Sequence, residues 1–157
     1  MDVLPQAGVL EWIGVRPGRR AELTSLSEVF AEADRGLTGD HYSKQGGKRQ
    51  VTLIQAEHLQ ALSSLMGLPL VTPDTVRRNL VVSGINLLAL KGKRFQIGEA
   101  ILEYTGLCHP CSHMEKVLGP GGYNAMRGHG GITAAVLGSG KIRVGDTVQT
   151  VPRQVDS

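Results

Sequence analysis

The sequence predicts a mainly β fold, a small barrel with a few short helices. Six or more short apolar segments are separated by glycine and polar turns, whereas only two or three segments have helical periodicity. The stretches FQIGEAIL and IRVGDTVQ also share one pattern, in which two strand segments meet at a glycine bend. Such bends are typical of the corners of small barrels, so both observations favour the same fold class.

The predicted strands are rich in Val, Ile, Leu and aromatic residues, and glycine or polar residues bound them. They comprise residues 8–15, 50–54, 79–84, 93–106, 131–137 and 141–151. The segments 93–106 and 141–151 each contain one of the glycine bends, and the turn Gly138-Ser139-Gly140 joins the last two segments. The polar, glycine-rich segment 35–50 is predicted to be a loop.

Short helices are predicted at residues 25–33, 56–67 and 112–118. In the first, Val29 and Phe30 are expected to face the core. In the second, the leucines of AEHLQALSSLMG share one face and Gly67 supplies the stop. The third begins with the capping-box spacing Ser112-x-x-Glu115.

Length and composition indicate one domain over residues 1–157, with a core at about 8–150. Hydrophobic residues make up 41% and charged residues 20%, as in ordinary globular domains. A net charge of +3 with 4% aromatic residues argues against a nucleic-acid surface. No apolar run approaches the roughly 18–20 residues that span a bilayer, and the first residues make a poor signal peptide. We therefore expect a cytoplasmic protein that binds neither nucleic acid nor membrane.

Both cysteines lie in LCHPCSHM, residues 107–114, and the C-x-x-C spacing is compatible with three chemistries. Structural zinc requires four ligands. A set of Cys108, Cys111, His113 and His129 can be drawn, but the chain has no second cysteine pair. A dithiol redox pair at a helix start is the thioredoxin arrangement, yet the surrounding βαβ pattern is missing.

The third chemistry is a single activated sulfur at Cys111. This residue directly precedes the helix that Ser112 caps, where unpaired N–H groups and the helix dipole stabilise a thiolate. Such a thiolate can act as a nucleophile, a persulfide carrier or a ligand to a soft metal. The alternative is a pair of inert core cysteines. Pro110 and its polar neighbours His109 and His113 favour the activated sulfur.

A second candidate site is the string VRRN, residues 76–79, directly before a buried strand. An arginine fork suits a phosphate, so Arg77 and Arg78 are candidates to bind an anion. Asn79 beside them can bind the edge of a polar heterocycle. The alternative is a solvated turn in which Asn79 makes a local hydrogen bond.

Several motifs in order closely resemble the MOSC domain, named for the C-terminal domain of molybdenum-cofactor sulfurases. They are GLTGDHY, KRQVTLIQAEHL, VRRNLVVSGIN, L-x-G-K-R-F-x-I-G, LCHPCSHMEKVLGPGGYNAMRGHGGITAAVL and IRVGDTV. The chain is similar to the small, stand-alone bacterial members over roughly residues 8–150. An ordered set of motifs is far more specific than any single one.

This resemblance implies a β-barrel and an association with the molybdenum cofactor, or molybdopterin, a pterin that carries a phosphate and a dithiolene-held molybdenum. Cys111 matches the invariant cysteine of the family, which carries sulfur or ligates molybdenum. Arg77 and Asn79 match the Arg-x-Asn of the cofactor pocket, with Arg78 between them. His41 in GDHY is a candidate for the rim of the site. Arg127 and His129 are candidates for residues that close over it.

The resemblance also sets out what the protein is expected to do. The preferred interpretation is a protein that binds the molybdenum cofactor or carries sulfur to it. The alternatives are a non-enzymatic module that delivers cofactor or docks a partner, and a molybdenum-dependent reductase of N-hydroxylated compounds. We expect no desulfurase domain like that of the sulfurases, so pyridoxal phosphate is expected only through a partner cysteine desulfurase. A molybdoenzyme is the other expected partner.

Overall fold

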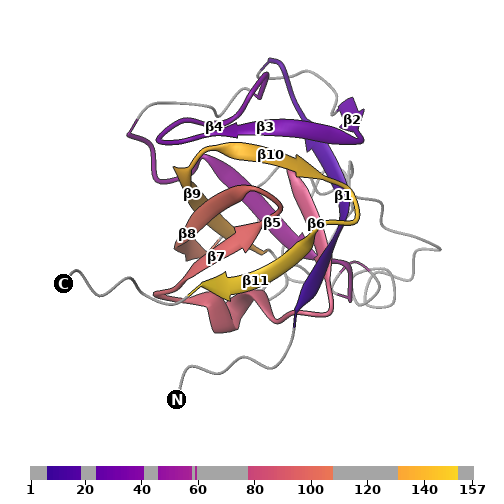
Figure 1. Cartoon of the computed structure of the whole chain (residues 1–157), viewed down its shortest axis with the longest axis vertical. Coiled ribbons are helices and arrows are strands. Elements are labelled where there is room, and N and C mark those ends of the chain that lie inside the picture. Colours follow the sequence, from indigo (N-terminus) through magenta and orange to yellow (C-terminus); the bar gives the residue numbers. More distant parts are fainter. Residues whose placement is uncertain are drawn as a thin grey trace, which may run out of the picture.

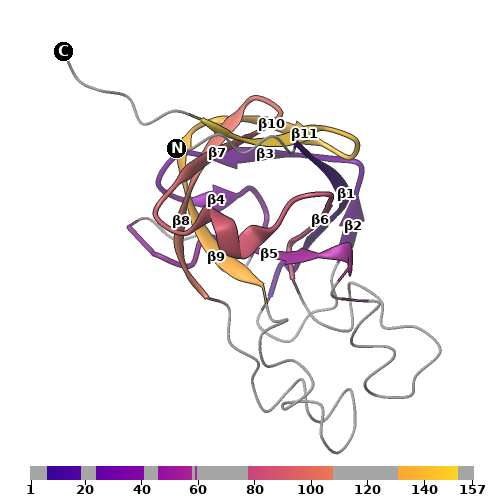
Figure 2. The ribbon, with the colours of Figure 1, turned by 90° about the horizontal axis from the view of Figure 1, so that it is seen from below.

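The computed structural model describes residues 7–18, 24–40, 46–57, 59, 78–107 and 131–151. Most of these residues form a closed β-barrel (Figures 1 and 2). In ring order its strands are β11 (Thr147–Val151), β7 (Arg94–Ile97), β8 (Ala100–Leu107), β9 (Ile132–Gly138), β5 (Val51–Gln55), β6 (Leu80–Ser83) and β1 (Gly8–Val15). The ring closes because β1 also pairs with β11. The predicted mainly β barrel is therefore confirmed.

A smaller sheet lies across one end of the barrel, above it in Figure 1. It consists of β10 (Gly140–Arg143), β3 (Glu28–Glu32) and β4 (Gly36–Leu37), while the short strand β2 (Thr24–Leu26) extends the barrel sheet beside β1. Ala31, Leu37 and Ile142 from this sheet are fully buried in the same core as the barrel residues. The small sheet therefore completes the core at that end.

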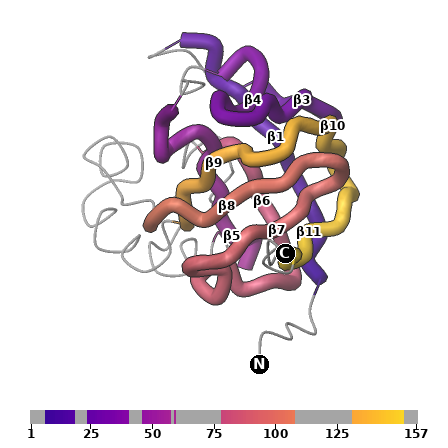
Figure 3. The backbone as a smooth tube through the Cα atoms, turned by 60° about the vertical axis from the view of Figure 1, so that its left-hand side comes forward, coloured from indigo at the N-terminus to yellow at the C-terminus, as the bar shows by residue number. Residues whose placement is uncertain are grey.

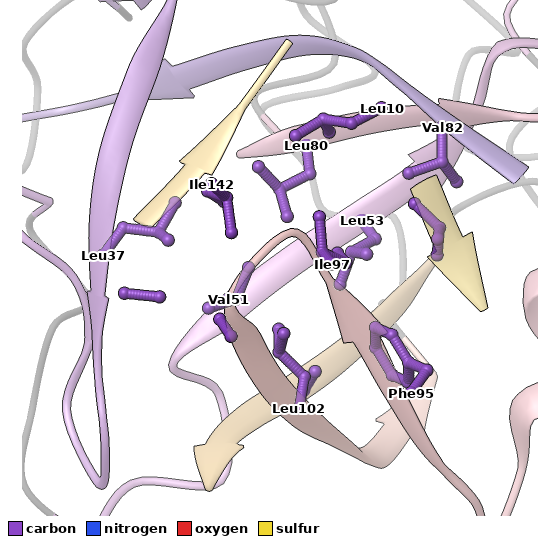
Figure 4. Close-up of a cluster of buried hydrophobic side chains, with 14 of the residues drawn as sticks. Leu10, Leu37, Val51, Leu53, Leu80, Val82, Phe95, Ile97, Leu102 and Ile142 are labelled. Atoms are coloured by element: carbon purple, nitrogen blue, oxygen red, sulfur yellow. The ribbon is translucent and has the colours of Figure 1, made fainter. Parts of the chain in front are cut away.

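The core is the interior of the barrel, filled by aliphatic side chains and one phenylalanine (Figure 4). Leu10, Leu53, Leu80, Phe95 and Leu102 have no exposed surface. Burying a side chain of this size contributes about 1.5–3 kcal/mol. Alternation along the strands supplies these residues, because every second side chain faces inward.

The pair β5–β6 is the one parallel pairing among the described strands, so the barrel is mixed. Its outward residues Thr52, Ile54 and Val81 are as deeply buried as the inward ones. Parallel pairs are normally covered on both faces, and this one follows that rule. Asn79, at the start of β6, shares the covered outer face.

The two predicted glycine bends are present. Gly98 turns β7 into β8, while Gly145 turns the chain from β10 in the small sheet to β11 in the barrel; their φ angles are +54° and +98°. The neighbouring strands β7, β8 and β9 can be followed side by side in Figure 3. The two turns also touch, because a side chain added at Gly98 would overlap the carboxylate of Asp146. The repeated motif thus builds two adjoining corners.

The predicted helix at 25–33 is wrong. This segment forms β2 and β3 with a bend at Ser27, and the burial along β3 alternates. Val29 faces the core as expected, but Phe30 is 46% exposed. The apolar run Val-Phe-Ala follows the strand period of two, with Val29 and Ala31 buried and Phe30 exposed between them. The predicted loop 35–50 also contains β4, whose two residues are buried.

Helical backbone begins at Ala56 and Glu57, where the second predicted helix starts, and is present at Leu59. The rest of that helix and the predicted helix 112–118 lie outside the described residues. Within the described ranges the one complete helical element is the 3-10 turn η1 (Leu87–Leu90). In that same part of the chain, no helix is long and apolar enough to cross a membrane.

Candidate functional site

A buried polar cluster marks the place where β1 ends and where β5 and β6 begin. Two of the predicted site residues, Arg78 and Asn79, belong to it, and both are buried. The other predicted site residues lie outside the described residues. They are Cys111, Arg77 and His41, together with Cys108, Arg127 and His129.

The side chain of Asn79 is 4% exposed and makes four hydrogen bonds. Its Oδ1 accepts from the backbone N–H and the hydroxyl of Thr52, at 3.0 and 3.1 Å. Its Nδ2 donates to the carbonyl oxygen of Gly14 and to Oδ1 of Asp40, each at 3.0 Å. These bonds use both donors and both acceptor positions of the amide. Asn79 therefore joins β1, β5 and the loop after β4.

The backbone of Asn79 makes two further bonds with the same neighbours. Its N–H donates to the hydroxyl of Thr52 at 2.9 Å, and its carbonyl accepts from the N–H of Gly14 at 2.7 Å. The local hydrogen bond expected for a solvated turn is thus replaced by contacts between distant parts of the chain. The residue holds three elements together at the start of β6.

Asp40 is a buried member of the cluster that the sequence analysis missed. Its Oδ1 accepts from the N–H of Arg16 at 2.9 Å as well as from Asn79. These bonds dock the end of the loop that follows β4 onto the ends of β1 and β6. The available signal was the motif GDHY, in which Asp40 directly precedes the predicted rim residue His41.

Arg78 is 2% exposed, so its guanidinium is among the largest fully buried groups in the described structure. Moving a charge out of water is costly unless polar or charged groups surround it. Arg16, Asp40 and Asn79 are buried at the same strand ends, and Asp40 carries the carboxylate among them. Buried residues with charged and polar side chains therefore gather at the start of β6.

The strand register relates this cluster to the ends of the cysteine segment. Leu107, the last residue of β8, pairs with Ile132 at the start of β9. Ile132 pairs with Leu53, which pairs with Leu80 at the start of β6. Neighbouring strands lie about 4.8 Å apart, so the start of β9 is about 10 Å from β6 and the end of β8 about 15 Å. The two ends of the segment that contains Cys108 and Cys111 are therefore level with the start of β6, at three and two strands from it.

Close packing fixes these two ends. Gly131 has a φ of +91°, and a side chain there would overlap the carbonyl of Leu53. Near the end of β8, Thr105 donates to the carbonyl of Lys48 and lies 2.9 Å from the hydroxyl of Thr133. The single hydroxyl hydrogen of Thr105 is thereby used, so Thr133 is the donor between them.

A separate open cleft of about 510 Å³ lies along β8 and β9. Asp34, Lys48, Glu103, Tyr104 and Thr105 provide its polar lining. Asp34 has a φ of +63°, and its carboxylate accepts from the N–H of Gly46 at 3.1 Å. The cleft has mixed charge and is shallow. As for metals, no group of three or more His, Cys, Asp and Glu side chains lies together within the described part of the chain.

Comparison with known proteins identifies the class to which this barrel belongs. Residues 40–149, well over half of the chain, match the model of the MOSC domain. The chain therefore belongs to the MOSC domain family, and the expected resemblance is confirmed.

Three solved structures show the same fold. The YuaD protein from Bacillus subtilis is 20% identical, with a TM-score of 0.76 over 94% of this chain and 97% of that one. YiiM from Geobacillus stearothermophilus is also 20% identical, with a TM-score of 0.76 over 93% of this chain and 76% of that one. YiiM from Escherichia coli is 19% identical, with a TM-score of 0.72 over 94% of this chain and 72% of that one. No curated protein matches the chain.

Proposed function

We propose that this MOSC protein binds the molybdenum cofactor or carries sulfur to it, with Cys111 as the reactive group. One observation carries the proposal. The register row from Leu107 through Ile132 and Leu53 to Leu80 sets the two ends of the cysteine segment level with the start of β6, at three and two strands from it, and Arg78 and Asn79 directly precede β6. A reactive cysteine in this segment, together with cations before β6, would suit a ligand that has a phosphate and a sulfur-reactive metal.

The positive charge of the arginine before β6 suits a ligand with a phosphate, whereas the predicted role of Asn79 as a ligand contact changes. Arg78 is a buried cation of the kind that suits a phosphate, and Arg77 directly precedes it. The amide of Asn79 is already saturated by Thr52, Gly14 and Asp40. We therefore assign Asn79 the task of positioning the arginines instead of contacting the ligand. His41 follows the docked Asp40 and stays a candidate for the rim.

When bound, the cofactor supplies a redox-active molybdenum and a pterin that carries its phosphate. The chain supplies the cations for the phosphate and one thiolate. As a sulfur carrier, Cys111 attacks the terminal sulfur of a donor persulfide. The sulfur–sulfur bond of the donor breaks, the donor leaves as a thiolate, and Cys111 retains the transferred sulfur as a persulfide. A partner cysteine desulfurase with its own pyridoxal phosphate is the expected donor in the cytoplasm.

The same site suits two other functions, a non-enzymatic module that delivers cofactor to a molybdoenzyme and a reductase of N-hydroxylated compounds. One preparation separates them. Protein from a cofactor-competent host is analysed for molybdenum and for pterin fluorescence, then tested for reduction of an N-hydroxylated base. Metal and pterin with reduction indicate the reductase, and metal and pterin without reduction indicate binding or delivery. Protein that contains neither metal nor pterin would contradict stable cofactor binding.

Arg77→Ala tests the proposed phosphate site. Loss of one charge-assisted contact costs about 1.5–3 kcal/mol, so cofactor retention should fall tenfold or more. Arg143→Ala is the matched control, because this half-exposed arginine lies on β10 and pairs with Glu28 at 3.7 Å. Equal retention by the folded Arg77→Ala variant and the parent would show that the strand start does not hold the phosphate.

A further inference from the structure

The single tryptophan of the chain lies beside the buried polar cluster, and a β-bulge directs it there. In β1, Leu10 pairs with Val82 and Trp12 with Val81, so Glu11 is an extra residue relative to β6. The inward residues are accordingly Leu10 and then Ile13, three positions apart. Trp12 is thereby turned to the outer face of the barrel. Bulges of this kind commonly re-aim a side chain next to a functional site.

The ring of Trp12 rests on Gly14, the next outward residue of β1. A side chain built at Gly14 would overlap the six-membered ring of Trp12, so glycine at this position lets the ring lie against the strand. Gly14 is itself bonded twice to Asn79, through its N–H at 2.7 Å and its carbonyl at 3.0 Å. Gly14 therefore links the aromatic ring to Asn79, which directly precedes β6.

Trp12 is half-buried, whereas its outer-face neighbours Gly14, Val81 and Asn79 are buried. One face of the indole thus packs against the strand, and part of the indole stays accessible. A flat aromatic surface of this kind stacks on planar heterocycles, since every such ring has a π face. Gly14 beneath it is bonded to Asn79, which directly follows the buried Arg78 in the chain.

We propose that Trp12 is the stacking platform for the planar ring of the ligand, a bicyclic heterocycle of the pterin type that also carries a phosphate. This inference rests on the function proposed above and names the residue that selects a flat ring. The bulge at Glu11 aims the platform, Gly14 seats it, and Asn79 connects it to the phosphate-binding strand. The alternative role for Trp12 is to cover a strand glycine, as aromatic residues do in other sheets.

Free pterin is the probe, and Trp12 reports on its own occupancy because the chain has one tryptophan. Titration with pterin should quench tryptophan emission in the parent protein to saturation. Pterin fluorescence anisotropy then measures affinity in all variants. Trp12→Leu should bind pterin at least tenfold more weakly, which is the usual effect of losing one stacked ring. Trp12→Phe should recover most of the affinity.

Two further variants distinguish stacking from a structural role. Gly14→Ala keeps the tryptophan but displaces its ring, so both quenching and affinity should fall. Phe30→Leu removes an exposed aromatic residue from β3 and should leave pterin binding unchanged. Thermal unfolding of each variant shows whether it is folded. Unquenched emission in the parent at saturating pterin, or parent-like affinity in folded Trp12→Leu, would overturn the platform.

Failure of the platform and failure of the proposed function give different results. A parent that stacks pterin on Trp12 but is isolated without molybdenum would keep the platform and contradict the cofactor proposal. A parent isolated with molybdenum and pterin, in which Trp12→Leu retains both and binds free pterin normally, would keep the cofactor proposal and overturn the platform.

Discussion

Asn79→Ala tests the most connected residue of the buried cluster. The substitution removes an amide that makes four hydrogen bonds, and it leaves two buried backbone groups without this partner. They are the N–H of Thr52 and the carbonyl of Gly14, whereas the carboxylate of Asp40 keeps its bond from the N–H of Arg16. The amide orientation follows from these neighbours, since a carbonyl must face the NH₂ group and an N–H must face the oxygen. The methyl group of alanine has no donor or acceptor that could replace the amide.

The expected loss of stability follows from this count. Leaving one buried polar group without its partner costs about 1–3 kcal/mol, so two groups at the lower bound give about 2 kcal/mol. In a domain of this size that corresponds to a fall in Tm of about 4–8 °C. Thermal and urea unfolding, each followed by tryptophan fluorescence, measure the change.

Asn86→Ala is the matched control. Asn86 is exposed, and its Oδ1 accepts from the N–H of Leu88 at 3.1 Å, which caps η1. Loss of such a cap typically costs about 1 kcal/mol. Asn79→Asp keeps the size of the side chain but turns an oxygen toward the Gly14 carbonyl and Asp40, so it should destabilise at least as much as alanine at neutral pH. If Asn79→Ala and Asn86→Ala unfold at the same temperature, the proposed role of the cluster is refuted.

Three other changes have defined outcomes. Cys111→Ser should abolish the gain of one sulfur from a cysteine desulfurase and free cysteine, measured by intact mass, whereas Cys108→Ser should keep most of it. Equal loss in both, with zinc in the parent, would favour a metal site. Gly131→Ala should lower the free energy of unfolding by more than the roughly 1–2 kcal/mol that a left-handed backbone costs a non-glycine residue, because its methyl group overlaps β5. Gly39→Ala, whose methyl group lies in open space, should lower it by that amount alone. A chain that ends at Val151 should keep the parental Tm, and a large fall would show that the last six residues pack.

Alternation and glycine spacing predicted most of the strands because those signals are local. The segments FQIGEAIL and IRVGDTVQ carry their own turns, and each forms the expected corner. The strand at residues 28–32 is not predictable in this way, because Val-Phe-Ala is a continuous apolar run that is compatible with a helix or a strand. Only pairing with β10 exposes Phe30 and buries its two neighbours.

The cluster around Asn79 was only partly predictable for a similar reason. The sequence predicts a role for Arg78 and Asn79 because these polar residues directly precede an apolar strand. The partners of Asn79 are 27, 39 and 65 residues away, so no local pattern could identify Thr52, Asp40 or Gly14. The bulge that turns Trp12 outward likewise depends on the register between β1 and β6. Contacts between distant segments set these roles.

The closure of the barrel by its first and last strands determines how the chain can fold. Gly8 pairs with Val148 and Val9 with Thr147, so the ring is complete only when nearly the whole chain is present. Contacts between such distant residues slow folding, because the loop entropy is lost before the pairing is gained. During synthesis the edge of β1 that pairs with β11 stays open until β11 has been made. Fusion of the two termini, with a new opening at the exposed turn of Gly92, should therefore speed the closure step while the finished barrel stays the same.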